Sequence, residues 1–449
     1  MPANNVVILD GSGSGDTGLT PILDVLSHTL AADGAQVETF TLREMKLAHC
    51  LGCFGCWVKT PGMCVEADAG RDVARAVIQS EILVLFTPVT FGGYSPELKR
   101  MMDRFVQLIS PYFQMDHGEV HHPPRYAKRP RLVVVGVQRQ PNPAEAHIFK
   151  TLAGRNAINL HPPSYASEVV LSTDTADVLR ARFEALLTRC DALPFGAAVE
   201  SLMPAPVAPS PAFESAGPRR ALLIVGSPKT SEPSTSGVLG GYLLDRLHER
   251  GWETESLTLR ASLNRPEGEQ ELFSAVERAG LILFLFPLYV DALPYLATKA
   301  MALLEARRRA VPPPFPQRLM AIVNSGFPET RQNSVALAIC REFAAQSNFT
   351  WAGALALGGG GAIGSQPLTA PNRSGAPVKN LIAALDITST TLSAGLPVPA
   401  EAVRLVAKNG IPFPVWRWLY MWFGSKGFEN QAARNGVGKD RLLAQPYAA

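Results

Sequence analysis

The sequence predicts two doubly wound α/β domains in tandem, each with a five-stranded parallel sheet, because one series of strands and loops occurs twice. In each half an apolar strand runs into a Gly-Ser turn, at residues 6–12 and 222–227. A later strand ends in a proline loop, at residues 83–88 and 282–287. In a doubly wound sheet these loops lie side by side at the carboxyl ends of the strands, where ligands bind. The repeat therefore predicts a nucleotide-type cofactor edge in each half.

Strands and helices alternate along both halves, as parallel sheets with right-handed crossovers require. The strands expected in the first half lie near residues 5–10, 36–42, 82–87, 131–137 and 166–171. Those expected in the second half lie near residues 221–225, 253–259, 281–286, 319–324 and 352–357, with helices such as 236–249 and 330–345. Thr20 and Pro21 predict the start of the first helix, as its N-cap and its first helical residue.

Composition indicates where the domains end. Residues 194–219 are rich in proline, alanine and serine, and we expect an extended linker there. The first domain is then residues 1–193, the second is 220–400, and a basic, aromatic tail covers 401–449. No window is apolar enough to span a membrane and the first strand follows Met1 without a signal peptide, so we expect a cytoplasmic protein.

The net charge of +3 excludes the strongly basic class of nucleic-acid-binding proteins. The tail carries an excess of positive charge, with seven Lys and Arg against three acidic residues in 401–449. It also holds three of the six tryptophans, Trp416, Trp418 and Trp422. Such a tail packs over a cofactor or against a second subunit, or makes peripheral contact with an anionic membrane.

The Gly-Ser turns predict phosphate binding, because each joins a strand to a helix N-terminus rich in N–H groups and hydroxyls. In the first half the candidate cofactor-binding residues are Ser12, Gly15, Asp16, Thr17, Gly18 and Thr20. In the second half they are Ser227, Lys229, Thr235 and Ser236. Gly13, Gly15 and Gly18 also spell the dinucleotide fingerprint, so a dinucleotide-binding dehydrogenase is an alternative, although the acid expected at the end of the second strand is missing.

The proline loop after the third strand of each half is suited to binding a flat aromatic ring. In the first half its candidate residues are Pro88, Val89, Thr90, Phe91, Gly92 and Gly93. In the second half they are Pro287, Leu288, Tyr289 and Val290. A Leu-Lys pair at 98–99 and an Asp-Arg pair at 103–104 follow the first loop.

These motifs resemble the NAD(P)H-dependent FMN reductase and iron-sulfur flavoprotein branch of the flavodoxin-like superfamily. The resemblance rests on Gly11-Ser12, on Cys50-Leu-Gly-Cys53 and on residues 87–104, in that order. It implies FMN as cofactor and NAD(P)H as co-substrate. These families usually have an aromatic residue where this chain has Thr90, so stacking on the flavin would fall to Phe91 or Tyr94.

Four cysteines, Cys50, Cys53, Cys56 and Cys64, lie in one continuous run. A 4Fe-4S cluster needs four thiolates, and the run is similar to the iron-sulfur flavoprotein motif. Zinc also binds four thiolates, although two separated pairs are its usual pattern. A third alternative is a metal-free, thiol-rich wall of the flavin pocket.

A polar segment before the predicted fourth strand contains further metal-ligand residue types, which are Asp116, His117, Glu119, His121 and His122. They form no i, i+4 histidine pair on a defined helix face. We therefore expect a solvated loop.

The function that fits these observations is an FMN-dependent NAD(P)H oxidoreductase. It would pass electrons to a quinone, flavin or iron-centre acceptor, either a small molecule or a redox protein. A flavin or cluster electron carrier without substrate turnover is an alternative. No catalytic acid or base stands out. The second half either binds flavin more weakly or completes a pseudo-dimer of domains, and the chain can also form a homo-oligomer.

Overall fold

The computed structural model describes residues 5–32, 34–192, 202, 217–229, 233–370, 376–408 and 413–448. The chain divides into two compact units. Unit 1 contains Met1–Glu200 and Tyr420–Ala449, and unit 2 contains Ser201–Leu419. Most of the predicted linker at 194–219 lies outside the described residues, and the domain boundaries drawn from composition stay a prediction.

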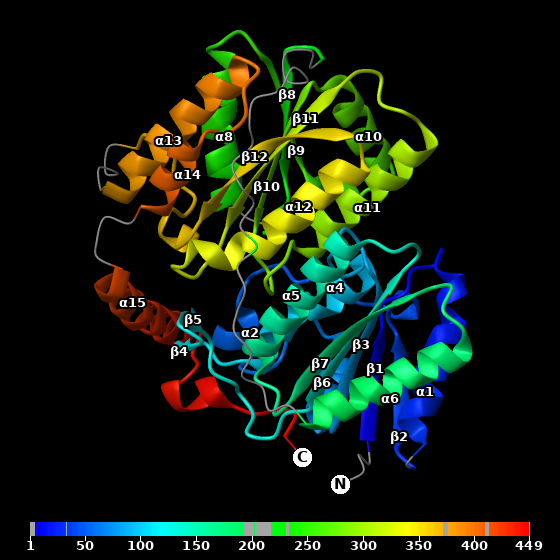
Figure 1. The fold of residues 1–449 in the computed structure, drawn as a ribbon. Coiled ribbons are helices and arrows are strands. Elements are labelled where there is room, and N and C mark those ends of the chain that lie inside the picture. Colours follow the sequence, from blue (N-terminus) through cyan, green and yellow to red (C-terminus); the bar gives the residue numbers. More distant parts are fainter. Residues whose placement is uncertain are drawn as a thin grey trace. The chain divides into compact units, whose positions relative to one another are not determined.

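A five-stranded parallel sheet forms the centre of unit 1 (Figure 1). Its strands are β1 (Asn5–Asp10), β2 (Gln36–Thr41), β3 (Ile82–Pro88), β6 (Arg131–Gln138) and β7 (Tyr165–Leu171). Their order is β2-β1-β3-β6-β7, and every pairing is parallel. This is the flavodoxin-like order, in which the chain reverses direction across the sheet between β1 and β3. The predicted fold class is confirmed for this half.

Helices cover both faces of this sheet. The longer helices and short helical segments of unit 1 are α1 (Thr20–Ala31), α2 (Gly55–Val58), α3 (Gly70–Gln79), α4 (Pro96–Met102), α5 (Pro143–Leu160), α6 (Ala176–Ala192), η1 (Thr17–Leu19), η2 (Leu42–Glu44) and η3 (Asp103–Leu108). Buried residues of α1 and α6, such as Leu26 and Phe183, pack with Val84 of β3 in one core cluster. A small antiparallel hairpin of β4 (Gln114–Asp116) and β5 (Glu119–His121) precedes β6.

The start of α1 differs from the sequence expectation. A short 3-10 turn, η1, comes directly before α1, so Thr20 is already helical and Leu19 occupies the N-cap position. Thr20 as N-cap is therefore wrong, because the turn extends the helical backbone toward the Gly-Ser loop. Pro21 still lies in the first turn of the helix, where its missing N–H costs no hydrogen bond.

Unit 2 repeats the same sheet, with parallel strands in the order β9-β8-β10-β11-β12. These strands are β8 (Arg220–Val225), β9 (Glu253–Thr258), β10 (Leu281–Pro287), β11 (Gln317–Asn324) and β12 (Phe349–Leu357). Its helical segments are α8 (Thr235–His248), α9 (Leu259–Leu263), α10 (Gly268–Arg278), α11 (Tyr295–Ala310), η4 (Thr330–Asn333), α12 (Ser334–Gln346), η5 (Gly360–Ala362), α13 (Ala376–Ser393) and α14 (Ala400–Ala407). The tandem of two doubly wound domains is confirmed.

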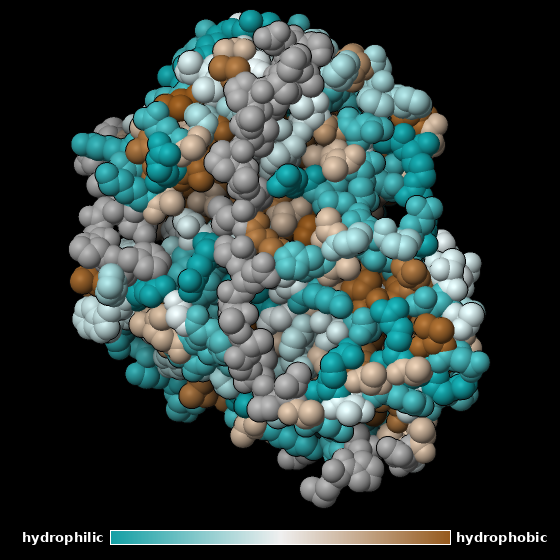
Figure 2. All heavy atoms as spheres, viewed as in Figure 1, coloured by the Kyte–Doolittle hydropathy of each residue, from teal (hydrophilic) through white to brown (hydrophobic). Residues whose placement is uncertain are grey.

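The chain ends in helix α15 (Phe413–Arg434) and the turn η6 (Lys439–Leu443). Among the described residues, no helix is both long and apolar enough to cross a lipid bilayer. On the face shown in Figure 2, hydrophobic residues gather in several small groups separated by hydrophilic ones. The central strands hold most of their apolar side chains in the cores, since β3 and β10 are each buried over six of their seven residues.

Replacing Gly11 with alanine should destabilise unit 1, since a Cβ there would lie 2.6 Å from Leu98 Cβ and 3.2 Å from Phe86 O. We expect Gly11→Ala to lower the free energy of unfolding by about 1–3 kcal/mol, the usual cost of overpacking. The matched control is Gly15→Ala in the same turn, where a Cβ meets no atom within 4 Å. Urea denaturation of both variants checks this, and equal stabilities would contradict it.

Candidate functional site

Two loops meet at the carboxyl edge of the sheet in unit 1. The Gly-Ser turn follows β1, and the proline loop follows β3, the neighbouring strand. Gly11 N–H donates to Phe86 O over 2.8 Å, and Ser95 Oγ donates to Gly11 O over 2.6 Å. Ser95 also caps α4 by accepting from the N–H of Leu98. The two loops predicted to share a cofactor are therefore joined directly by hydrogen bonds.

Two carboxylates hold the Gly-Ser turn in its conformation by accepting hydrogen bonds from its N–H groups. The buried carboxylate of Asp10 accepts from Ser12 N–H over 2.9 Å and pairs with Arg43 over 2.8 Å. The carboxylate of Asp16 accepts from Gly13 N–H over 2.9 Å and pairs with Arg139 over 3.0 Å. In this geometry Asp16 organises the turn, and a direct role in holding a phosphate stays a prediction.

Other donors of the turn point to open space. Ser12 is buried, whereas Gly15, Thr17, Gly18 and Thr20 are exposed along the start of the helix. Within the described part of the chain, the N–H groups of Ser14 and Gly15 donate to no protein acceptor. These groups are available to an anion at the helix N-terminus.

The dinucleotide alternative fits this turn poorly. The last glycine of that fingerprint normally permits close packing of helix on strand. A Cβ at Gly18 would meet no atom within 4 Å, so nothing in the packing requires a glycine there. The strand order is also the flavodoxin-like one and not the order of dinucleotide-binding sheets.

The proline loop of unit 1 closes in a tight turn between Thr90 and Gly93. Thr90 N–H donates to Gly93 O over 3.0 Å, and Gly93 N–H donates to Thr90 O over 2.8 Å. The two central residues, Phe91 and Gly92, have φ values of 54° and 82°. Two positive φ values in succession define a type I′ turn.

Unit 2 forms the same turn between Tyr289 and Ala292, with reciprocal hydrogen bonds of 2.9 and 3.1 Å. Its central residues are Val290 and Asp291, at φ values of 49° and 57°. A β-branched residue rarely adopts a positive φ, and such strain persists only where the surrounding structure imposes it. The loop geometry is therefore shared by the two halves even though the glycines are not.

The side chains at this loop differ in exposure. Pro88, Val89 and Thr90 are half-buried, as are their counterparts at 287–289 in unit 2. Phe91 and Tyr94 are buried, and the ring of Tyr94 packs edge-on against Phe149 with centroids 5.7 Å apart. Neither aromatic ring therefore faces the loop surface, so stacking by Phe91 or Tyr94 would require a rearrangement.

The phosphate turn of unit 2 is engaged in internal contacts. Thr235 Oγ1 donates to Gly360 O over 3.2 Å, and Ser236 Oγ accepts from Asn324 Nδ2 over 2.8 Å. Ser227 is buried and Lys229 is exposed, whereas residues 230–232 lie outside the described residues. Two hydroxyls predicted to bind a phosphate thus already have protein partners.

The four clustered cysteines lie in the loop between β2 and α3. Cys53 is exposed, Cys50 and Cys64 are half-buried, and Cys56 is buried at the start of α2. Burial, with contributions from Asp103 and the neighbouring thiols, raises the pKa of Cys50 to about 12. Burial also raises the pKa of Cys56, and the charges of the other three thiols add to this effect. All four sulfurs are therefore close enough to interact electrostatically.

Two buried arginines flank these thiols. Arg104, which pairs with Asp68 over 2.6 Å, interacts with Cys64, and Arg125 interacts with Cys56. Arg104 Nε and Arg125 Nη2 are buried and have no acceptor among the described residues. An unpaired donor on a buried cation is costly. An anionic group bound by the cysteines would offset this cost.

The described residues contain no group of three or more His, Cys, Asp or Glu side chains arranged to hold a single metal ion. The four thiols are thus not arranged around one point in this structure.

The polar segment before β6 is not the solvated loop we expected. Glu119 and His121 are completely buried on β5. Glu119 Oε2 accepts from Arg155 Nη2 over 2.9 Å and lies 3.3 Å from His121 Nε2. His121 Nδ1 is 3.0 Å from Asn159 Oδ1. The prediction was wrong because these side chains satisfy one another against α5, which makes their burial tolerable.

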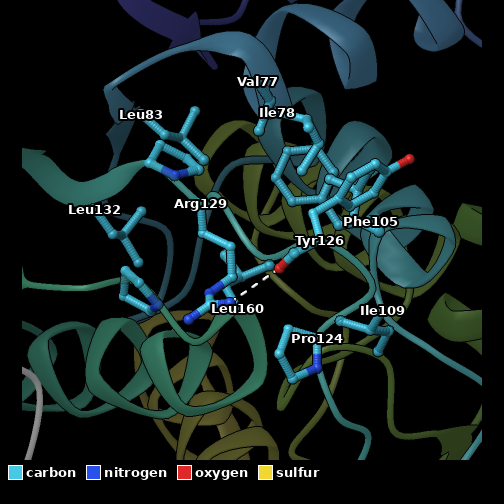
Figure 3. A pocket seen from close by; sticks show the side chains of 13 residues that line it. Val77, Ile78, Leu83, Phe105, Ile109, Pro124, Tyr126, Arg129, Leu132 and Leu160 are labelled. Carbon is cyan, nitrogen blue, oxygen red and sulfur yellow. Dashed lines mark hydrogen bonds between the residues drawn. The ribbon is translucent and has the colours of Figure 1, made fainter. Parts of the chain in front are cut away.

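A small cavity lies at the opposite, amino-terminal edge of the same sheet (Figure 3). Leu83 and Leu132, near the starts of β3 and β6, line it together with Ile78, Tyr126 and Arg129. Its volume of about 30 Å³ holds roughly one water molecule. The cavity is therefore too small for a flavin and lies away from the phosphate turn.

Comparison with known proteins agrees with this geometry. Residues 4–170 match the family described as NADPH-dependent FMN reductase. The matched residues lie within one segment of unit 1. This segment runs from β1 to β7 and includes the Gly-Ser turn, the cysteine run and the proline loop.

Part of the chain is also similar to curated proteins. An iron-sulfur flavoprotein of Methanocaldococcus jannaschii is 29% identical over 99 residues, which are 22% of this chain and 50% of that protein. A second one from the same organism is 33% identical over 91 residues, 20% of this chain and 46% of that protein. The chain thus spans about half the length of the curated relatives that it matches.

Among solved structures, an NAD(P)H:quinone oxidoreductase from Methanothermobacter marburgensis has a TM-score of 0.32 and 15% identity. The match covers 42% of this chain and 97% of that chain. An FMN-dependent NADH-azoreductase from Bacillus anthracis has a TM-score of 0.30 and 12% identity, with coverage of 42% and 99%.

The stability of unit 1 should fall at acid pH because of His122. Its half-buried ring packs against Trp57 and Phe113, with centroids 4.6 Å away in each case, and loss of hydration lowers its pKa to about 3. Below the unfolded pKa of about 6.5 only the unfolded chain is protonated there, which removes up to about 1.4 kcal/mol of stability per pH unit. Urea denaturation of wild type and His122→Gln between pH 7 and pH 4 checks this, and parallel profiles would contradict it.

Proposed function

We propose that the protein is an FMN-dependent oxidoreductase that takes electrons from NAD(P)H. One observation carries the proposal, namely the direct hydrogen bonding of the Gly-Ser turn to the proline loop at the sheet's reversal point. The FMN reductase match covers both loops and supports this assignment. Bound FMN would supply the hydride and single-electron chemistry.

The chain's own residues would hold the cofactor at two places. The open N–H groups of Ser14 and Gly15, together with the hydroxyls of Ser12, Thr17 and Thr20, are suited to the phosphate. The half-buried segment Pro88–Thr90 would lie along the ring, and the type I′ turn up to Gly93 fixes its backbone. Arg139, which is exposed beside Asp16, would add positive charge near the phosphate.

We further propose that Cys50, Cys53, Cys56 and Cys64 bind a 4Fe-4S cluster that relays electrons from the flavin to the acceptor. Four thiolates in one run suit a cluster, and the buried Arg104 and Arg125 offer positive charge and free donors beside Cys64 and Cys56. The names of the curated relatives, iron-sulfur flavoproteins, agree with this choice. The acceptor is a quinone, a flavin or an iron centre.

An electron carrier without substrate turnover is the second candidate. The match to the family described as NADPH-dependent FMN reductase favours turnover, because it covers both loops of the proposed site. Steady oxidation of NADPH or NADH with menadione or free FMN as acceptor distinguishes the two. A carrier without substrate turnover would oxidise at most about one equivalent of NADPH or NADH per bound flavin and then stop.

Flavin should bind in unit 1 and be lost on changing its phosphate turn. We expect Ser12→Ala with Thr17→Ala to lower FMN affinity, since each hydroxyl bond to a charged phosphate contributes roughly 1.5–3 kcal/mol. The matched control is Ser227→Ala with Thr235→Ala in unit 2, where Thr235 already bonds to Gly360 O. Flavin released by heat is counted per chain. Full flavin in the first variant would contradict binding in unit 1, and two flavins per wild-type chain would contradict a weaker site in unit 2.

The cysteine run should hold iron and sulfide together. Changing any one of Cys50, Cys53, Cys56 and Cys64 to serine in anaerobically purified protein should lower both and leave FMN bound, because the phosphate turn is separate. Cys190→Ser is the matched control, as this thiol is buried on α6. Iron, zinc and acid-labile sulfide are assayed per chain. Zinc without sulfide, or no metal in the wild type, would overturn the cluster.

A further inference from the structure

The end of the chain returns to the cysteine run after passing through unit 2. Residues 420–448 belong to unit 1, and Figure 1 shows the last turns of the chain, in red, beside β4 and β5. Cys56, Trp57 and Val58 form one apolar cluster with Ala432 and Leu442. The cysteine run therefore has a buried wall that is supplied from the far end of the sequence.

Aromatic rings of helix α15 form one part of this wall. Phe428 lies edge-on to Trp57 with centroids 4.9 Å apart, and to Phe54 at 5.5 Å. Phe54 in turn stacks on Trp57 at 5.0 Å. The helix approaches closely, because a Cβ at Gly424 would lie 2.7 Å from the ring of Phe113. These contacts pack α15 onto the loop that carries the thiols.

The last residues of the chain form the other part of the wall, and a polar network holds them in place. Gln107 Oε1 accepts both from Cys64 N–H over 2.9 Å and from the buried Tyr447 O–H over 3.1 Å. Gly62, at a φ of 85°, leaves no space for a side chain, because a Cβ would lie 2.5 Å from Pro446. The cysteine run thus meets the last residues of the chain directly at Gly62 and through the side chain of Gln107 at Cys64.

The same segment also orients a cation. Arg125 Nη1 donates to Leu442 O over 2.8 Å and to Ala444 O over 2.9 Å. Its Nε donates to Gln107 O over 3.1 Å, which leaves Nη2 buried without an acceptor in the described chain. The carbonyls of the C-terminal segment therefore hold the guanidinium beside Cys56.

We propose that residues 420–448 are a cover for the cysteine site, which excludes water from Cys56 and holds Arg125 as a positioning residue for the bound anion. Cys53 alone of the four thiols is left exposed. The cover rests only on contacts within unit 1. The role of Arg125 rests, in addition, on the proposed cluster.

The cover is tested on metal-free, full-length protein by thiol labelling. Leu442→Ala with Tyr447→Ala removes two buried side chains of the cover, and Leu443→Ala, whose side chain is 51% exposed, is the matched control. We expect a maleimide to label Cys56 many-fold faster in the double variant than in the wild type or the control, with sites mapped by mass spectrometry. Unchanged labelling of Cys56 in a double variant with native circular dichroism would overturn the cover.

If the double variant fails to fold, Leu442→Ala alone is labelled and hydrogen exchange is measured on the wild type. Amides of residues 55–59 and 442–447 should then become accessible at the same rate, since the two segments open together. Protection of 55–59 that persists while 442–447 exchanges freely would also overturn the cover.

The role of Arg125 is tested on anaerobic, cluster-loaded protein. Arg125→Met should shift the midpoint potential of the cluster to more negative values and shorten its lifetime in air several-fold, because a cation beside an anionic cluster favours the reduced form. Arg129→Met is the matched control, as Arg129 donates to three backbone carbonyls of the same region. An unchanged potential would overturn the role of Arg125. If no cluster loads at all, the proposed function fails, and the labelling experiment still decides the cover.

Discussion

The close approach of Gly11 to strand β3 and helix α4 is the constraint on which the cofactor edge of unit 1 depends. Gly11 N–H reaches Phe86 O, and its own carbonyl accepts from Ser95, so the turn after β1 is held against the loop after β3. No Cβ fits in that space. Because Ser95 also caps α4, one small contact sets the direction of the turn, the loop and the following helix. An anion and a flat ring held by these two loops would therefore share one rigid frame.

Several buried charged side chains lie close to the cysteine run. Lys99 and Asp103 form a buried ion pair on α4 and η3, next to Arg104 with its partner Asp68. Charges that leave water need partners of good geometry, or they destabilise the fold. Arg104 Nε and Arg125 Nη2 have none among the described residues. Arg104 pairs with Asp68 and Arg125 bonds to three carbonyls, so within the described chain only these single atoms lack a partner, and the proposed anionic ligand of the cysteines would supply one.

The sequence predicted the sheets well and the site only in part. β1, β3, β8 and β10 were predictable because strands buried on both faces are continuous apolar runs, and each begins or ends at a recognisable turn. The burial of Glu119 and His121 could not be predicted, because polar side chains indicate exposure unless their buried partner, Arg155 on α5, is known. The role of residues 420–448 was equally hidden. Their contacts with Trp57 join positions more than 350 residues apart, and no periodicity in the sequence encodes such a pairing.

The two units share the backbone geometry of the proline loop but differ in the phosphate turn that a cofactor would need. Unit 2 keeps the type I′ turn at Val290 and Asp291 although the β-branched Val290 rarely adopts a positive φ, whereas unit 1 has a glycine at the second of these positions. The backbone of the loop is thus maintained at a cost in strain. The phosphate turn of unit 2 has instead bonded its hydroxyls to Gly360 and Asn324. A loop whose shape persists while its neighbouring anion site is filled from within is best explained as part of the sheet's architecture, so the strained turn alone does not mark a second flavin site.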